Sequence, residues 1–284
     1  MSTFKHNSMS TIFKRCAPGL VCLGGLLASA GCSPSVEPEA ASSRAPVPEV
    51  VGPPVKSRSV WRSYYALGDA DIQPDKVNST GFACEFPSDE KGVTYFVSAL
   101  HIAEDRTEPI TEAAEAARIY QAIGSVGATE AYGASDGMNF LGILADPPAE
   151  GMAEEPSLLY DVVLVQRGKV GLKAMPLAQT MPVEGDKLYL ATAVYGGAPA
   201  SQTAHEAEVL SVSSDGKLEY RFVNERLSLQ ATDGAPLLDE SGAVVGMHLH
   251  GDKSETGVTG EGISMLEFWN RYSATSTAVA NDTQ

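Results

Sequence analysis

The sequence predicts a mainly β fold. Its apolar residues gather in short runs of about four to eight, which is typical of strands, rather than in long stretches with helical periodicity. Glycine occurs 27 times among the 284 residues and aromatic residues make up only 7% of the chain. This composition favours many short strands over bundled helices, arranged as one domain or as two small fused subdomains.

Residues 1–31 are expected to be a lipoprotein signal peptide. Lys5, Lys14 and Arg15 form a basic start, and the apolar run "APGLVCLGGLLASAG" is too short to span a bilayer comfortably. The run leads into "LLASAGC", which resembles a bacterial lipobox and implies lipidation of Cys32. An ordinary secretory signal with an incidental cysteine is the alternative. Ser33 resembles the residue that sorts such lipoproteins to the outer membrane. We therefore expect the protein to be anchored by lipid in the bacterial cell envelope, at the outer membrane or the cell surface.

Two further segments are expected to lie outside the folded part. Residues 32–59 are rich in proline, serine, alanine and glutamate and contain no aromatic residue, which predicts a tether without a core of its own. Residues 273–284, "SATSTAVANDTQ", are expected to form a flexible tail. The folded domain should therefore cover residues 60–272.

The charge of the chain argues against one class of partner. Its formal net charge is −16, whereas binding to nucleic acid needs clustered Lys and Arg to displace counterions from phosphates. We therefore expect no nucleic-acid partner. The cysteines predict no disulfide framework, because only Cys84 falls inside the predicted domain. We expect Cys84 to be a buried free thiol.

The strand candidates fall into two groups along the chain. The first group is expected at 79–86, 93–100, 139–145 and 158–166. The second group is expected at 187–195, 206–214, 217–223, 234–240, 243–250 and 261–268. The Asp215-Gly216 pair predicts a hairpin with a type I′ turn. One helix, over 111–124, interrupts the first group and is expected to serve packing.

Four segments in this order resemble the trypsin-like serine proteases. "TGFACEF" with "GVTYFVSALHIAED" resembles the first strands and the catalytic histidine, and "YDVVLVQ" resembles the segment that carries the orienting aspartate. "EGDKLYLATAVYGG" is similar to the connection that opens the second barrel, and "ATDGAPLLDESGAVVGMHLHG" to the nucleophile turn and the strand after it. The resemblance implies a double six-stranded antiparallel β-barrel, with the first barrel over about 60–175 and the second over 176–272.

The resemblance also implies a catalytic constellation in which one member is replaced. His101 matches the histidine that accepts the proton of the nucleophile, and Asp161 matches the carboxylate that orients it. Gly234 and Pro236 fix the register of the turn, which puts Asp233 in the place of the nucleophilic serine. A carboxylate there cannot stand in for serine, because its attack on an amide would give a strained anhydride and its charge would oppose the developing oxyanion.

Other site residues follow from the same turn and strand. Ala231, Thr232 and Gly234 match the turn that holds the oxyanion. His248 resembles the pocket histidine of the glutamate-specific branch of the family, and His250 and Gly251 the substrate-binding edge. A metal held by His248, His250 and a carboxylate is a weaker alternative, since no third ligand has a diagnostic spacing; a solvated polar cluster around Asp233 is another. No cofactor and no metal are expected.

The sequence therefore predicts an exported serine protease homologue without catalytic activity that binds peptides or proteins at the cell envelope. One alternative is an active serine endopeptidase-like hydrolase with a different nucleophile, for which Thr232 and Ser228 are the nearest hydroxyls. Another is a structural envelope lipoprotein without a ligand.

Overall fold

The computed structural model describes residues 52–56, 58–72, 79–87, 92–130, 139–140, 142–167, 171–192 and 204–282. All of them fall within the compact unit Pro48–Gln284. The predicted signal peptide and Cys32 lie outside the described residues. Within the described part of the chain, no helix is long and apolar enough to cross a membrane.

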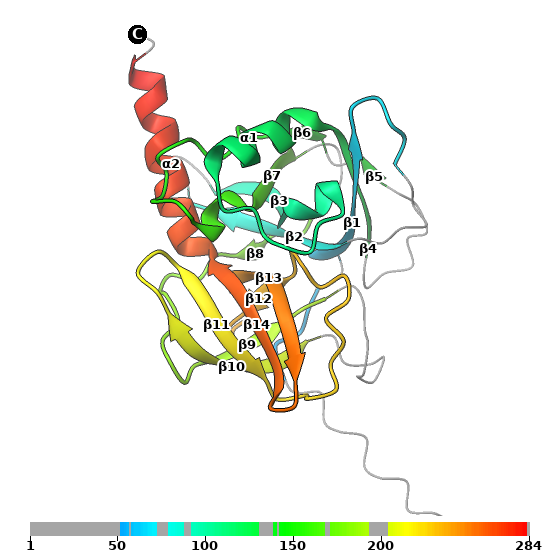
Figure 1. The fold of residues 1–284 in the computed structure, drawn as a ribbon, viewed down its shortest axis with the longest axis vertical. Helices are drawn as coiled ribbons and strands as arrows, with labels where there is room; N and C mark the ends of the chain where they lie inside the picture. The colour runs from blue at the N-terminus through cyan, green and yellow to red at the C-terminus, as the bar shows by residue number, and fades with distance from the viewer. Residues whose placement is uncertain are drawn as a thin grey trace, which may run out of the picture. The chain divides into compact units, whose positions relative to one another are not determined.

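The first half of the domain is one eight-stranded sheet (Figure 1). Hydrogen-bonded ladders connect seven of its strands in the order β5-β4-β1-β2-β3-β7-β6, and β8 pairs with β2. All these pairs are antiparallel except β2 with β8. The strands are β1 (Val60–Leu67), β2 (Ser79–Phe86), β3 (Val93–Ala99), β4 (Ile123–Glu130), β5 (Asn139–Phe140), β6 (Gly142–Leu144), β7 (Val162–Arg167) and β8 (Met175–Pro176).

The second half is a closed barrel of six antiparallel strands in the order β10-β11-β14-β13-β12-β9. Its interior is filled by a separate apolar cluster that includes Leu190, Leu218 and Leu237. The strands are β9 (Lys187–Leu190), β10 (His205–Val212), β11 (Lys217–Phe222), β12 (Pro236–Leu238), β13 (Val244–Ser254) and β14 (Gly257–Ser264). The mainly β fold with one barrel in each half is thus confirmed, and short strands extend the first barrel beyond the six expected.

Two long strands of the first sheet were not expected from the sequence. In β1, Arg62 and Ser63 interrupt the apolar pattern, and β4 contains two glycines. The two strands pair with each other from Trp61 to Leu67, so tertiary pairing outweighs weak local propensity. Gly124 is required there because a Cβ at that position would lie 1.8 Å from the carbonyl oxygen of Gly68.

The helix and the hairpin that the sequence predicts are both present, with changed details. Helix α1 covers Ala113–Ala122 and buries Ala116 and Ile119 against the core of the first half. Strands β10 and β11 form the expected hairpin. Its turn is not type I′, however, because only Gly216 has a positive φ, of 85°, and Asp215 does not. Gly216 is therefore the one residue of this pair whose left-handed conformation reverses the chain direction.

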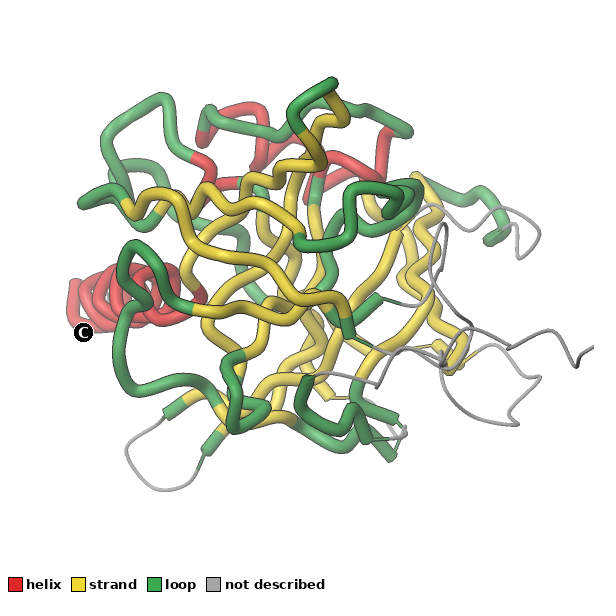
Figure 2. Tube along the Cα trace, turned by 90° about the horizontal axis from the view of Figure 1, so that it is seen from below, coloured by secondary structure: helices red, strands yellow, loops and turns green. Residues whose placement is uncertain are grey.

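The C-terminal segment differs most from expectation. Strand β14 ends at Ser264, and helix α2 (Met265–Asp282) follows directly (Figure 2), although 261–268 was expected to be a strand and 273–284 a flexible tail. The physical reason lies in packing: Phe268 is fully buried and Trp269 stacks on Phe86 of β2 at 4.6 Å between ring centroids. Docking of these aromatic rings on the first sheet stabilises the first turns, and the helix propagates from them.

The end of the predicted tether also belongs to the domain. Pro53 is buried, Val55 packs against the core of the first half, and Ser59 is almost fully buried, where its hydroxyl donates to the carbonyl oxygen of Lys173. Residues 52–59 were expected to lack contacts because of their composition. These contacts with the domain hold the segment next to β1, which begins at Val60.

Candidate active site

His101 and Asp161 are held together by two contacts on one carboxylate. His101 follows β3 as the first residue of a 3₁₀ turn (His101–Glu104), and Asp161 caps a second 3₁₀ turn (Leu158–Tyr160) just before β7. The backbone N–H of His101 donates to Asp161 Oδ1 at 2.7 Å, and His101 Nδ1 lies 2.6 Å from Asp161 Oδ2. Both side chains are fully buried. The carboxylate thus fixes both the backbone and the ring, which leaves Nε2 as the only ring nitrogen able to face the site.

The turn that carries Asp233 is defined by its own backbone hydrogen bonds. The N–H of Thr232 donates to the carbonyl oxygen of Leu229 at 3.3 Å, and the N–H of Ala235 donates to the carbonyl oxygen of Thr232 at 2.9 Å. Ala231 adopts a left-handed conformation with φ of 57°, and Gly234 has φ of 82°. The N–H of Gly234 donates to the carbonyl oxygen of His248 at 2.7 Å. This last bond anchors the turn on β13.

The same turn is also attached to the first half of the domain. The N–H of Thr80, in β2, donates to the carbonyl oxygen of Asp233 at 3.0 Å, and the Thr80 hydroxyl donates to that of Ala231 at 2.9 Å. A Cβ on Gly234 would lie 2.3 Å from the carbonyl oxygen of Thr80. The approach of the two halves therefore requires glycine at 234, as the sequence register implied.

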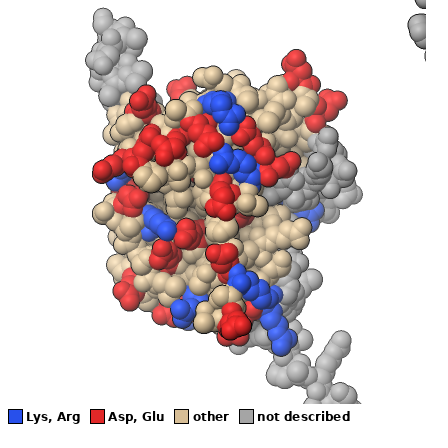
Figure 3. All heavy atoms as spheres, in the orientation of Figure 1, with Lys and Arg blue, Asp and Glu red and all other residues tan. Residues whose placement is uncertain are grey.

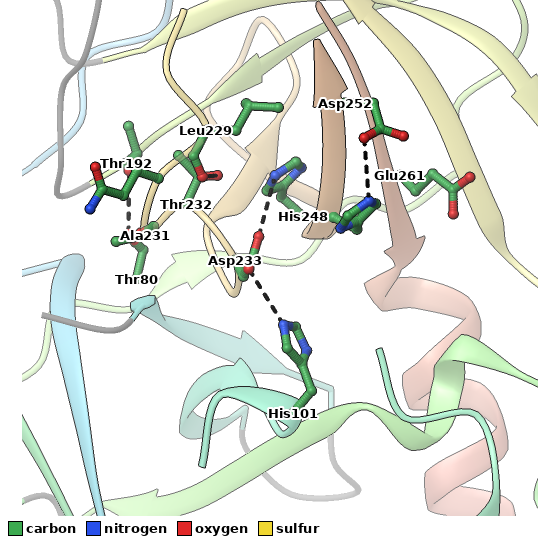
Figure 4. A network of polar contacts seen from close by, with 12 residues as sticks. Thr80, His101, Thr192, Leu229, Ala231, Thr232, Asp233, His248, Asp252 and Glu261 are labelled. Atoms are coloured by element: carbon green, nitrogen blue, oxygen red, sulfur yellow. Dashed lines mark hydrogen bonds and ion pairs between the residues drawn. The ribbon is translucent and has the colours of Figure 1, made fainter. Parts of the chain in front are cut away.

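Asp233 lies between two imidazoles (Figure 4). Its Oδ2 lies 3.4 Å from His101 Nε2, on the ring edge away from Asp161, and its Oδ1 lies 3.7 Å from His248 Nε2. The Asp233 side chain is 21% exposed, whereas both histidines are fully buried. The structure thus brings together the three residues of the predicted constellation, His101, Asp161 and Asp233, and adds His248 to them.

His248 is tied down from its other ring nitrogen. Its Nδ1 is hydrogen-bonded to the Tyr220 hydroxyl, which also lies 3.3 Å from the carbonyl oxygen of Glu261. Because the Asp233 carboxylate faces Nε2, the favoured tautomer carries its hydrogen on Nε2 and accepts from Tyr220 at Nδ1. His248 is therefore not part of a solvated cluster, contrary to one of the alternatives, since the barrel interior encloses it.

The two histidines have opposite electrostatic settings. Burial lowers the pKa of His101, but the negative charges of Asp161 and then Asp233 outweigh this and raise it to about 9. Burial dominates at His248 and lowers its pKa to about 4. Burial also raises the pKa of Asp161, against the effect of the His101 charge. At neutral pH, Asp233 therefore faces a cationic and a neutral imidazole.

A cleft of about 470 Å³ opens beside Asp233. His250 and Gly251, which the resemblance assigned to a substrate-binding edge, lie on its wall, and they also line a smaller neighbouring cavity of about 260 Å³. Two other residues of the wall, Ala231 and Asp233, were also assigned to the site from the sequence, and the remaining ones were not. The cleft is lined by Ile102, Asp105, Arg106, Thr107, Leu229, Gln230, Ala231, Asp233, His250 and Gly251.

The metal site considered from the sequence is not formed. A bulge between His248 and His250 breaks the register of β13 with β14. His248 Nε2 faces Asp233, whereas His250 Nε2 lies 3.8 Å from Asp252. In the part of the chain that the structure describes, no three His, Cys, Asp or Glu side chains are grouped to hold a metal ion.

The hydroxyls near the turn are directed elsewhere. Thr232 is fully buried, and its Oγ1 donates to the carbonyl oxygen of Leu229 at 2.7 Å. Ser228 Oγ accepts from the N–H of Gln230 at 3.4 Å. Tyr220 is the functional neighbour that the sequence analysis missed, although the alternation of "KLEYRF" points it into the barrel. No local signal indicated that it would meet His248.

Comparisons with known proteins give structural neighbours but no sequence relatives. No protein-family model and no curated protein matches the chain. The Rv3671c protease from M. tuberculosis is 16% identical with a TM-score of 0.44, over 75% of this chain and 79% of that one. A serine endoprotease from Yersinia pestis is 16% identical with a TM-score of 0.43, over 79% and 62%. The thermostable serine protease AL20 from an extremophilic microorganism is 13% identical with a TM-score of 0.47, over 78% and 98%. The three structures named here are of proteases, and at these identities and TM-scores the likeness says nothing about the chemistry of this chain.

Proposed function

We propose that this chain is a serine protease homologue that lacks serine peptidase activity and binds peptide or protein ligands in the cleft beside Asp233. One observation carries the proposal: a carboxylate oxygen of Asp233 lies 3.4 Å from His101 Nε2, at the place where a nucleophilic hydroxyl would have to be. In triads of this kind, loss of the nucleophile costs on the order of 10⁶ in turnover.

The walls of the cleft support a peptide ligand. β12 pairs with β13 only at Val244, Gly246 and Met247. Farther along β13, at His250 and Gly251, the described ladders connect this strand to β14 alone. An extended peptide can therefore add to the open edge of β13 through backbone hydrogen bonds, with side chains placed in the adjoining cavities.

The test of binding uses the full chain and an immobilised library of extended peptides. We expect selective binding, weakened in His250→Ala, whose side chain lines the cleft and is 29% exposed. Lys253→Ala is the matched control on the exposed end of the same strand. Absence of any selective binding would favour a structural envelope protein without a ligand.

The test of inactivity is a fluorophosphonate probe, which labels activated serine and threonine hydroxyls. The unmodified protein should not react. Labelling that is lost in His101→Ala would favour the second candidate, an active hydrolase that uses a hydroxyl such as that of Thr232 or Ser228. The observed directions of these two hydroxyls do not favour it.

The location and partners belong to the same proposal. We place the protein at the bacterial cell envelope, held by lipid on Cys32, at the outer membrane or the cell surface. The net charge of −16 supports a partner other than nucleic acid, and acidic side chains are widely spread over the face in Figure 3. Metabolic labelling with an alkyne fatty acid should tag the wild type but not Cys32→Ser.

A further inference from the structure

Asp233 is the side chain that a molecule entering the cleft meets before it reaches the buried residues. It lines the cleft and is 21% exposed, whereas His101 and Asp161 behind it have no exposed surface. One of its oxygens is 3.4 Å from His101 Nε2. The site therefore presents a carboxylate with a histidine–aspartate pair directly behind it.

The product of attack by this carboxylate depends on the carbon attacked. At the acyl carbon of a peptide it would give an anhydride, which is why peptidase chemistry is not expected. At a saturated carbon that carries a leaving group it gives an ester, and an ester carbonyl is a group that water activated by a histidine hydrolyses. The residues around Asp233 thus suit electrophiles with a saturated carbon.

We propose that Asp233 is the nucleophile in a covalent hydrolysis of epoxides to vicinal diols, with His101 as the residue that gives and recovers the proton. Epoxides are favoured over alkyl halides because their leaving oxygen needs a proton, and His101 holds one beside the carboxylate. The activity is separate from peptide binding and does not depend on it.

The first step is ring opening. Asp233 Oδ2 attacks one epoxide carbon, a new carbon–oxygen bond forms, and the ring carbon–oxygen bond at that carbon breaks. The departing oxygen takes the proton from Nε2 of the His101 imidazolium. The products are a β-hydroxy ester of Asp233 and a neutral His101. The pKa of about 9 means that His101 carries this proton at neutral pH.

The second step is hydrolysis of the ester. Once Asp233 is esterified, its negative charge no longer supports the His101 cation, so the neutral ring can act as a base. Nε2 takes a proton from water, the remaining hydroxide adds to Cγ of Asp233, and the bond from Cγ to the ester oxygen breaks. The alkoxide takes the proton of the new carboxylic acid. The diol leaves, and Asp233 carboxylate and His101 imidazolium are restored.

His248 supplies a donor for the second step. When Oδ2 is alkylated, Oδ1 becomes the carbonyl oxygen, and it faces His248 Nε2 at 3.7 Å. Among the described residues, this buried nitrogen has no hydrogen-bond partner. With Nδ1 engaged by Tyr220, the Nε2 hydrogen is directed at the oxygen on which negative charge develops.

The test uses the full chain at neutral pH with 1,2-epoxy-3-(4-nitrophenoxy)propane in oxygen-18-labelled water. Wild type should form the diol over repeated turnovers and incorporate the heavy oxygen into Asp233, as shown by peptide mass mapping. His101→Gln should slow diol formation by about 10² or more, because it removes both the proton donor for ring opening and the general base for hydrolysis of the ester. Asp233→Asn should form neither the ester nor the diol.

Controls separate this result from simple alkylation of carboxylates. Asp105 lines the same cleft and is exposed, so an equal rate of esterification at Asp105 and Asp233 would overturn the proposal. Diol formation by folded His101→Gln at the wild-type rate would overturn it as well. Asp161→Asn, which keeps the shape of the side chain, repeats the test if His101→Gln does not fold, and diol formation should slow there too. An ester that persists equally in wild type and variants would exclude the hydrolytic step.

Discussion

His101 Nε2 and Asp233 Oδ2 lie 3.4 Å apart although 132 residues separate them in the chain. The contact joins a residue that follows β3 in the first half to a turn anchored on β13 in the second. Thr80 of β2 holds the backbone of this turn at two points, Ala231 and Asp233. The backbone thus fixes the position of residue 233 independently of its side chain, and substitutions there can test the chemistry without rebuilding the turn.

Asp233→Ser should create reactivity toward a fluorophosphonate that the wild type lacks. The substitution removes the charge that opposes an oxyanion and places a hydroxyl within reach of His101, which Asp161 already orients. Labelling can be measured by gel fluorescence and mapped by mass spectrometry. It should disappear when His101→Ala is added. If the folded Asp233→Ser protein stays unlabelled, the turn does not present residue 233 as a triad would.

His101 should titrate near pH 9 in the wild type and at a lower pH in Asp233→Asn. Asp233 supplies part of the negative charge that raises the pKa, so its neutralisation favours the uncharged ring. Imidazole resonances followed by NMR would measure both values. An unchanged pKa in Asp233→Asn would show that Asp161 alone sets it.

The same shift predicts how stability depends on pH. The pKa of His101 is about 9 in the folded protein against 6.5 for an unperturbed histidine. Its contribution to the free energy of unfolding is therefore fully present below pH 6.5 and is lost as the pH rises to about 9. Urea unfolding at several pH values should show this loss in the wild type and a smaller one in Asp233→Asn.

Gly234→Ala should destabilise the protein far more than Gly151→Ala. Both glycines have positive φ, 82° and 78° respectively. A Cβ at 234 would lie 2.3 Å from the carbonyl oxygen of Thr80, whereas no atom of the described residues lies within 4 Å of one at 151. The control should lose about 1–2 kcal/mol from the left-handed backbone alone, and Gly234→Ala should lose more, because the halves must separate. Equal losses in urea unfolding would contradict the close approach.

Tyr220→Phe should cost about 1–3 kcal/mol of stability, since it leaves a buried ring nitrogen of His248 without its hydroxyl partner. Tyr64→Phe is the matched control, because the Tyr64 hydroxyl pairs with Thr129, which is less buried, at 3.2 Å. We expect a smaller cost there. A neutral Tyr220→Phe would mean that the contact with His248 contributes nothing to folding.

Strands whose side chains alternate regularly could be predicted from the sequence, and β1 could not. Strand β2 was predicted with its exact ends, and β11 to within one residue. In β1, Ser63 is fully buried and accepts a hydrogen bond from Ser98 of β3. A polar side chain inside the sheet reads as solvent-facing in the sequence, because its partner lies on a strand far along the chain.

The residues of the candidate site also fall into those that could be predicted from the sequence and those that could not. The resemblance of four ordered segments to the trypsin-like serine proteases was enough to group His101, Asp161 and Asp233, because the register of the Gly234 turn is local. The second imidazole contact of Asp233 depends on how β13 passes behind that turn. The Tyr220 contact depends on β11 and β13 both pairing with β14, which brings their side chains together inside the barrel. These are long-range consequences of barrel closure, and no short stretch of sequence encodes them.

Helix α2 has a consequence for how the protein comes apart. It continues from the last strand of the second barrel, yet Trp269 donates a hydrogen bond to Pro87 and Tyr272 donates one to Asp146, both in the first half. Helix α2 is thus covalently continuous with the second barrel and packed on the first half. Unfolding of either half removes one of these two supports. We expect a single cooperative unfolding transition. Proteolytic removal of the helix from Met265 onward would expose the aromatic surface around Phe86 and promote aggregation.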